Sequence, residues 1–172
     1  MAATTGNVLT AAQFNQYWRD NLLVSEAAVA TNAGNLLVAD GAHSIVERIP
    51  TVGFTSGTDT TTSTTFTTLF NDTSVVATTG ANVLVSIGGA IDNDTAHFGG
   101  RIGLDISGAT TRSASDAVSY YSDISNPGYV AQGTWTTIVS LTAGLNLFDL
   151  RYRAVFGGTA AFSHRLVAVV PF

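Results

Sequence analysis

The sequence predicts a mainly β protein, an antiparallel and jelly-roll-like β-sandwich of about eight strands, preceded by one N-terminal α-helix and an extended connector. After Pro50, short runs of alternating apolar and polar residues recur at regular spacing. Turn residues separate these runs, for example Ser107-Gly108 and Ala143-Gly144. Helical spacing of large apolar residues is confined to the N-terminus. We therefore expect a helix and connector over residues 1–50 and a β-sandwich over residues 51–172.

The predicted helix begins at Thr10. Its hydroxyl can cap the first turn, and Gln13 is spaced to close a capping box with it. Apolar and aromatic residues then recur on one side of the helix, and with the residue before the cap they form the candidate anchor of the chain. The anchor consists of Leu9, Phe14, Tyr17, Trp18 and Leu22.

A helix of about four turns is marginal alone in water, so this anchor needs a partner surface. Two interpretations are open: docking onto another protein or onto copies of this chain, and packing against the chain's own β-body. Residues 25–50 carry repeated Asn, Gly and Asp breaks. We interpret this stretch as an extended connector with local apolar contacts at Leu36, Leu37 and Val38.

The β-body begins with a Thr-rich run over residues 56–68, whose second half we predict to be a strand because β-branched Thr favours extended backbone. Regular alternation follows over residues 83–87, 102–106, 135–141 and 148–154, and a last strand lies around 166–170. In the run 148–154, Asp149, Arg151 and Arg153 fall on one side. We expect them to form cross-strand charge pairs on an outer sheet face.

Composition restricts the function classes. Cysteine is absent from the 172 residues, only 11% of residues are charged, and the net charge is −5. These values do not show the excess of positive charge that binding to nucleic acid or to an anionic membrane requires. No run of about 18 apolar residues is present to span a bilayer. We expect no nucleic-acid partner and no membrane insertion.

Metal and cofactor binding have little support in the sequence. Asp92 and Asp94 flank Asn93 and are weak candidates for a hard-cation site, since such cations prefer several oxygen ligands. The EF-hand spacing is not met, because Ala96 stands where a third ligand is needed. An Asx-rich turn is the favoured interpretation. We therefore expect no metal and no cofactor.

No catalytic residue is predicted, and we expect the protein not to be an enzyme. The only two Glu residues precede the β-body, and no Gly-x-Ser-x-Gly nucleophile motif occurs. The three histidines, His43, His97 and His164, follow no recognisable pattern. His164 alternates with Phe162 and Leu166, which fits a satisfied histidine within the sandwich or at a subunit interface.

A ligand site is conceivable around the segment 122–132, which is flanked by aromatic residues. The candidates are Tyr120, Tyr121, Tyr129 and Trp135. Aromatic faces beside Asp and Asn can bind a sugar by stacking and hydrogen bonding, which would suit a host-receptor-binding tip. Packing in the core or at an interface is the favoured alternative.

Two segments resemble tailed-bacteriophage virion proteins of the minor tail or fibre type. The first runs over residues 6–15, GNVLTAAQFN, and continues to 18–22, WRDNL; the second is 141–146, LTAGLN, which leads into 148–153. In that family a helix with this start and end precedes a β-rich display domain. The resemblance is to structural proteins and carries no enzyme signature.

The resemblance implies a structural subunit of a phage particle, made in the host cytoplasm and assembled into the virion. It implies a homo-oligomer, typically a trimer, whose N-terminal helix contacts other virion proteins and whose sandwich is exposed. A capsid decoration or head-fibre protein would share this plan, and a host-glycan-binding module at a tail tip is a further alternative. The chain has no long repetitive shaft, which departs from a full tail fibre.

Overall fold

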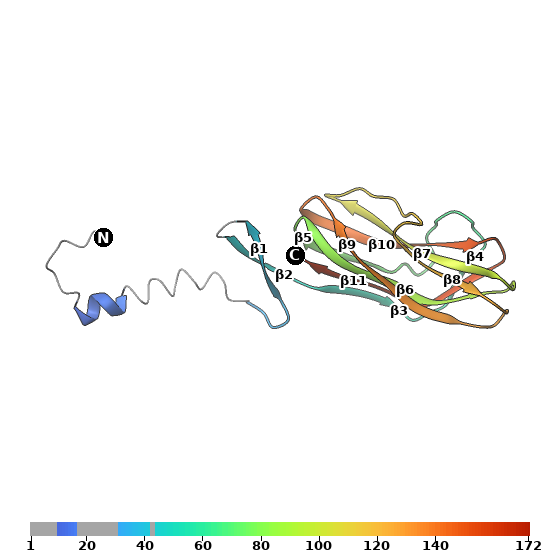
Figure 1. Ribbon diagram of the computed structural model, residues 1–172, viewed down its shortest axis with the longest axis horizontal. Helices are drawn as coiled ribbons and strands as arrows, with labels where there is room; N and C mark the ends of the chain where they lie inside the picture. Colours follow the sequence, from blue (N-terminus) through green and yellow to red (C-terminus); the bar gives the residue numbers. More distant parts are fainter. Residues whose placement is uncertain (1–9, 17–30, 42–43) are drawn as a thin grey trace. The chain divides into compact units, whose positions relative to one another are not determined.

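The computed structural model describes residues 10–16, 31–41 and 44–172. The chain divides into two compact units, Met1–Glu47 and Arg48–Phe172. Among the described residues the protein is mainly β, with eleven strands and one short helical segment over residues 11–16 (Figure 1). None of the helical residues described forms a segment long and apolar enough to cross a membrane.

The helix of the N-terminal unit begins at the predicted capping box. The backbone N–H of Thr10 donates to Gln13 Oε1 at 3.0 Å, and the backbone N–H of Gln13 donates to Thr10 Oγ1 at 3.2 Å. These reciprocal bonds satisfy two groups that a helix start otherwise leaves unpaired. Of the predicted anchor, Phe14 is described and is exposed. The other members lie outside the described residues: Leu9, Tyr17, Trp18 and Leu22.

The expected connector has secondary structure of its own, a two-stranded sheet of β1 (Leu36–Gly41) and β2 (Ser44–Arg48). The Glu47 carboxylate accepts hydrogen bonds from the Thr31 backbone N–H at 2.7 Å and from Asn35 Nδ2 at 2.8 Å. Hydrogen bonds from Thr31 and Asn35 hold the pKa of Glu47 below its ordinary value. Leu36 and Leu37, which were expected to make local apolar contacts, are exposed.

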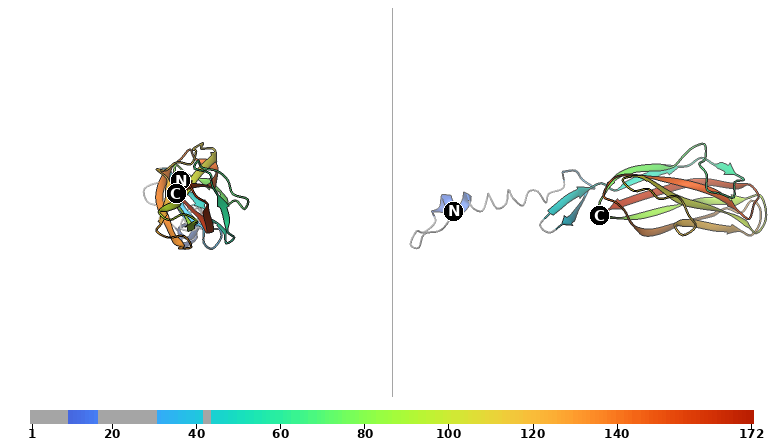
Figure 2. Two further views of the ribbon diagram at one scale, coloured as in Figure 1. Left: turned by 90° about the vertical axis from the view of Figure 1, so that its right-hand side faces the viewer. Right: turned by 90° about the horizontal axis from the view of Figure 1, so that it is seen from above.

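The second unit is a β-sandwich of two antiparallel sheets. Its strands are β3 (Thr51–Thr55), β4 (Asp59–Thr61), β5 (Ser74–Thr79), β6 (Asn82–Asn93), β7 (Phe98–Gly108), β8 (Ser119–Ile124), β9 (Ala131–Ser140), β10 (Gly144–Val155) and β11 (Ala160–Pro171). One sheet has the order β5-β10-β7-β8, and the other has the order β3-β11-β6-β9 with β4 also paired to β11. Viewed end-on, the strands surround a single interior (Figure 2).

The strand order confirms the jelly-roll prediction. When the eight principal strands are counted along the chain, with β4 left out, the sheets have the orders 1-8-3-6 and 2-7-4-5. This is the arrangement of two interlocked Greek keys that defines a jelly roll. Strands distant in sequence therefore become neighbours: β11 lies between β3 and β6, and β10 lies between β5 and β7.

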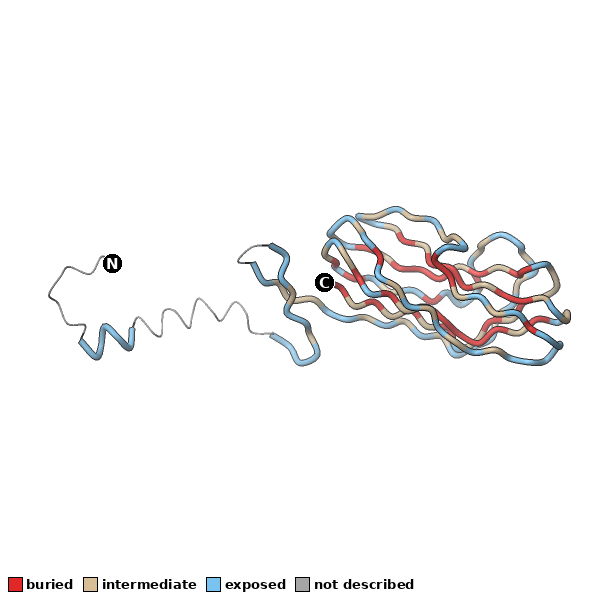
Figure 3. Tube along the Cα trace, viewed as in Figure 1, coloured by how far each residue is buried: buried red, intermediate tan, exposed pale blue. Residues whose placement is uncertain are grey.

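The core lies between the sheets, where alternation places one side of each strand. Ile87 of β6, Leu104 of β7, and Phe148 and Leu150 of β10 are at most 1% exposed. Buried residues follow these strands through the sandwich (Figure 3). The runs of period-two hydrophobicity in the sequence correspond to these strands, because only inward positions lose contact with water.

The Thr-rich run departs from its prediction. Its second half was expected to be a strand, but the short strand β4 lies in the first half, and Thr67 forms only an isolated bridge with Tyr152. The Ser63 hydroxyl donates to the Thr65 carbonyl at 2.7 Å, a local bond that competes with strand pairing. The Phe66 ring occupies the space above Gly103 of β7. A ring contact and local hydroxyl bonds thus hold this segment.

A β-bulge interrupts β11. Between Ser163 and Leu166 the pairing with β6 slips by one residue, so that β11 contains an extra residue. His164 lies in this bulge with φ of +50°. Phe162 faces the interior before the bulge and Arg165 faces it afterwards, and both are fully buried. The bulge therefore moves the inward positions of β11 from even to odd numbers.

Candidate functional site

The outer side of the β3-β11-β6-β9 sheet carries an area without charged side chains, which we call the neutral face; Asp92 of β6 lies on the same side of the sheet but outside this area. Its residues form three cross-strand rows, set by the pairing register. The rows are Phe54, Leu166, Gly88 and Thr134; Val52, Ala168, Ser86 and Thr136; and Val170, Leu84 and Ile138. Their side chains alternate with the inward-facing residues of the same four strands.

Large apolar side chains are exposed on the neutral face. Val52 is 65% exposed, Phe54 59% and Ile138 61%. The polar members carry only hydroxyl groups, and the hydroxyls of Ser86 and Thr136 hydrogen-bond to each other at 2.6 Å. Surfaces of this kind cost little to desolvate, because no ion must be removed from water. A contiguous apolar surface on a soluble domain is a candidate interaction site.

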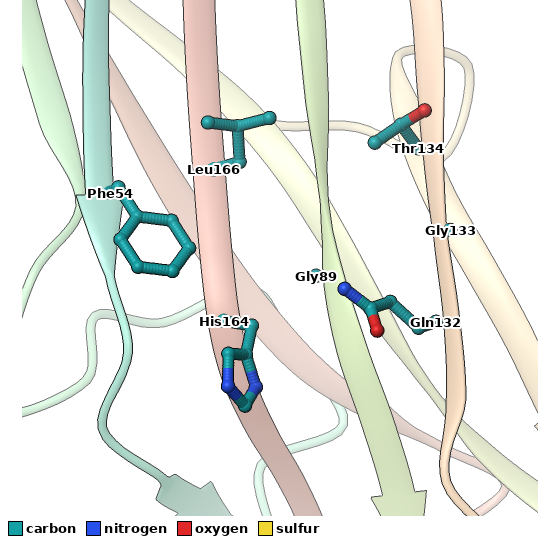
Figure 4. Close-up of a pocket in the computed structure, with 7 residues that line it drawn as sticks. All are labelled: Phe54, Gly89, Gln132, Gly133, Thr134, His164 and Leu166. Atoms are coloured by element: carbon teal, nitrogen blue, oxygen red, sulfur yellow. The ribbon is translucent and has the colours of Figure 1, made fainter.

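A shallow hollow of about 280 Å³ lies beside one row of the neutral face (Figure 4). It is lined by Phe54, Gly89, Gln132, Gly133, Thr134, His164 and Leu166. Gly88, in the same row, has no room for a side chain, because a Cβ would clash with the Gly133 carbonyl oxygen and with Thr134. Close approach of β6 and β9 therefore excludes a side chain at this position.

His164 borders the hollow and is exposed on the outside of the sheet. Of the two alternatives for His164, a position within the sandwich is wrong, because the bulge turns its side chain outward. A position at a subunit interface stays a prediction. Its ring centroid is 6.3 Å from that of Phe54, and its Nδ1 is 3.3 Å from Ser163 Oγ. A positive φ is uncommon in residues with a Cβ and stores backbone strain.

The other sheet presents a charged face. Arg151 pairs with Asp149 at 2.8 Å and with Asp105 on the neighbouring strand at 3.7 Å, and Arg153 pairs with Asp116 at 2.8 Å. The Arg151–Asp105 pair confirms the predicted cross-strand pairing, whereas Asp149 lies on the same strand as Arg151 and Asp116 lies in the loop before β8. Burial, opposed by the charge of Arg151, raises the pKa of Asp149.

The four candidate aromatic residues do not form one cluster. Tyr120 and Trp135 are half-buried and pack against the core, and the Tyr120 ring lies beside Gly133. Tyr121 alternates to the outer side of β8, where the Arg101 guanidinium lies over its ring at 4.8 Å. Tyr129 is exposed in the loop before β9. A sugar-binding role for this region stays a prediction that rests on Tyr121 and Tyr129.

Asp92 and Asp94 take part in hydrogen bonds of the turns at one end of the sandwich. Asp92 Oδ1 accepts from the Asn93 backbone N–H at 2.7 Å, and Asp94 Oδ1 accepts from the Thr159 backbone N–H at 2.8 Å. The bond from Thr159 contributes most to holding the pKa of Asp94 below its ordinary value. Within the described residues, no three His, Asp or Glu side chains gather as metal ligands.

Sequence reasoning missed a buried charge. Arg165 is 0% exposed, and its Nη2 donates to Asp59 Oδ2 at 2.8 Å and to the Gly57 carbonyl at 3.3 Å. Its guanidinium lies 5.5 Å from the Tyr152 ring centroid. Among the described residues, Nε and Nη1 of Arg165 and the Tyr152 hydroxyl have no hydrogen-bond partner. The available signal was a single arginine inside the last apolar run.

No protein-family model matches this chain, and no curated protein matches it. Among solved structures, it is similar to a chain of infectious bursal disease virus Gt strain, with 12% identity, 80% of this chain covered and a TM-score of 0.45. A chain of the Gx strain gives 14% identity, 84% coverage and a TM-score of 0.34. The chain spans 38% and 40% of the lengths of these two viral chains.

A third similar structure is TmCBM61 in complex with β-1,4-galactotriose, with 8% identity and a TM-score of 0.29. The match covers 81% of this chain and 84% of that chain. Similarity at these levels assigns no function.

Proposed function

We propose that this chain is a non-enzymatic structural subunit of a tailed-bacteriophage particle, a minor tail or fibre protein. The N-terminal helix attaches it to other virion proteins, and the jelly roll is presented at the virion surface. The observation that carries the proposal is the reciprocal capping box of Thr10 and Gln13. It begins a helix inside the segment that resembles phage virion proteins, in a unit separate from the sandwich.

The test changes the anchor in the full chain. Phe14→Ala combined with Trp18→Ala should abolish incorporation into phage particles, because the helix loses the side chains proposed for contact. The far-UV circular dichroism of the sandwich should stay unchanged. Gln16→Ala, on the polar side of the predicted helix, is the matched control and should incorporate normally. Normal incorporation of the double variant would remove the helix from the attachment role.

Location within the particle separates two forms of this proposal. A minor tail or fibre protein should appear on the tail when particles with a tagged chain are imaged. A label distributed over the head would instead support a capsid decoration or head-fibre protein.

The absence of catalysis is part of the proposal. Support comes from the structural use of charged groups: Asp59 pairs with Arg165, Asp116 pairs with Arg153, and Asp94 closes a turn. Purified protein should leave host polysaccharide intact, as measured by the release of reducing ends. Sustained polysaccharide cleavage would contradict this part of the proposal.

Host-glycan recognition is the second candidate function, favoured by the exposed rings of Tyr121 and Tyr129. Aromatic rings that face water provide the stacking surface that sugars require. A glycan array probed with the full chain, and with Tyr121→Ala and Tyr129→Ala, tests this function. Binding that both variants lose would support it, whereas no signal on host-derived glycans would remove it.

A further inference from the structure

We infer that the neutral face is the surface through which the sandwich packs against another copy of this chain. The inference rests on the proposed oligomeric virion subunit and names the surface that joins its copies. It depends on the exposure, charge and area of the neutral face, all within residues 48–172, which the structure describes in full.

The neutral face exposes large apolar side chains to water. Val52, Phe54 and Ile138 are each more than half exposed, although they lie in regular strands beside buried neighbours. Isolated exposed apolar residues are ordinary on protein surfaces, but these belong to adjoining rows with Leu84 and Leu166. Covering such a surface removes apolar area from water and stabilises an assembly by about 25 cal/mol per Å² before the costs of association.

Charge favours a second copy as the occupant. The chain carries a net charge of −5, so copies of it repel one another. The neutral face contains no charged residue, whereas the outer side of the other sheet carries Asp105, Asp149, Arg151 and Arg153. Around a three-fold axis, the neutral faces of three copies can meet without burying an ion or placing like charges together. An apolar and hydroxyl-bearing surface is therefore compatible with its own copy.

The area of the neutral face is smaller than the area that a stable interface buries. Strands lie about 4.8 Å apart and outward residues recur about every 7 Å, so four strands and three rows project roughly 400 Å². A stable interface buries about 800 Å² on each partner. The neutral face supplies about half of this area, so a stable trimer needs a second contact between copies beside it.

The first experiment introduces a charge into the full chain. Val52→Glu places a carboxylate on the neutral face, and Val76→Glu places one on the outer side of edge strand β5, where Val76 is 53% exposed. Sedimentation equilibrium should give a trimer whose dissociation constant rises at least about tenfold with Val52→Glu. It should change less than about threefold with Val76→Glu. Equal effects of the two substitutions would overturn the inference.

The second experiment does not depend on the folding of a charged variant. Because the chain has no cysteine, Ile138→Cys and Leu145→Cys each introduce one thiol, at sites that are 61% and 62% exposed in the single chain. In the oligomer, a maleimide reagent should modify Ile138→Cys at least about tenfold more slowly than Leu145→Cys. Equal rates in the oligomer would show that the neutral face is open, and would overturn the inference.

Two further outcomes separate this inference from the proposed function. If Ile138→Cys is open in the purified oligomer and protected only in phage particles, another virion protein covers the face and the second-copy inference fails while the proposed function stands. If added β-1,4-galactotriose is needed for protection, a sugar occupies the face, and the inference also fails. A chain that forms trimers with a protected Ile138→Cys but never enters particles supports the inference and removes the proposed function.

Discussion

Strands β10 and β11 are both twelve residues long and both lie inside their sheets, yet only one follows simple alternation. In β10, Phe148, Leu150 and Tyr152 face the core in turn. In β11 the bulge at His164 resets the count and places Arg165 in the core. One inserted residue therefore decides which side chains a strand buries, because successive side chains of a strand point to opposite faces of the sheet.

Single-residue deletions in the two strands should have the largest effects on stability. Deleting Arg151 from β10 turns Tyr152 and the inward residues after it to the outer face, and we expect loss of the folded state. Deleting His164 from β11 removes the extra residue and leaves Arg165 and Val167 facing inward. We expect that deletion to retain cooperative urea unfolding with a loss of less than about 2 kcal/mol. Similar losses in both deletions would contradict this account of the bulge.

The ion pair made by β11 should show the next largest effect. Asp59→Ala leaves the Arg165 guanidinium buried without its carboxylate, which should lower the free energy of unfolding by about 3 kcal/mol. Arg165→Met should cost less, because a Met side chain needs no partner and the Asp59 carboxylate is 15% exposed. Urea unfolding measures both. A larger loss for Arg165→Met would show that the buried charge itself stabilises the fold.

The same pair predicts a dependence on acid. Burial raises the pKa of Asp59, but the hydrogen bonds from Arg165 and Asn71, together with the charge of Arg165, outweigh it and hold the pKa below its ordinary value. The contribution of the pair to stability is therefore complete above the ordinary pKa and is lost as the pH falls through the lowered one. The stability difference between wild type and Asp59→Ala should shrink over that acidic range.

Alkaline unfolding tests the core position of Tyr152 in β10. Burial raises the pKa of its hydroxyl to about 12, against an ordinary value of 10.0. Below pH 10 the group is protonated in both states, and between pH 10 and 12 only the unfolded chain ionises. Wild type should lose roughly 2–3 kcal/mol across that range through this group. Tyr152→Phe should lack this loss, as measured by urea unfolding at pH 9 and at pH 12.

The smallest expected effect concerns the bulge backbone. His164→Gly should raise the free energy of unfolding by up to about 1 kcal/mol, because glycine adopts a positive φ without a Cβ clash. Ser163→Gly, one position earlier, should lower it by roughly 0.5–1 kcal/mol. A lower melting temperature for His164→Gly would show that contacts of the imidazole outweigh the backbone strain.

The sandwich could be predicted where hydrophobic alternation is uninterrupted. Val85 of β6, Leu104 of β7 and Leu150 of β10 lie in the core as their spacing indicates. The capping box at Thr10 was also readable, because both partners lie within four residues. Local patterns specify these features, so the sequence alone is sufficient to find them.

The neutral face and the bulge could not be predicted. The face joins rows from four strands, and only the pairing register brings Val52, Ser86 and Thr136 together. The bulge at His164 depends on the partner strand, since nothing within residues 160–171 marks an extra residue. The two-stranded sheet β1–β2 was missed for a similar reason, because its support comes from Glu47 across twelve or more residues.

The central position of β11 affects biosynthesis. This strand comes last among those of the jelly roll, yet it lies between β3 and β6, and its arginine pairs with a carboxylate 106 positions earlier. While a ribosome is still translating the unit, one sheet lacks its middle strand, and nascent apolar segments have no partner to cover them. Such long-range topologies fold in milliseconds to seconds. Until β11 has been made, the new chain therefore exposes apolar segments that a chaperone can bind.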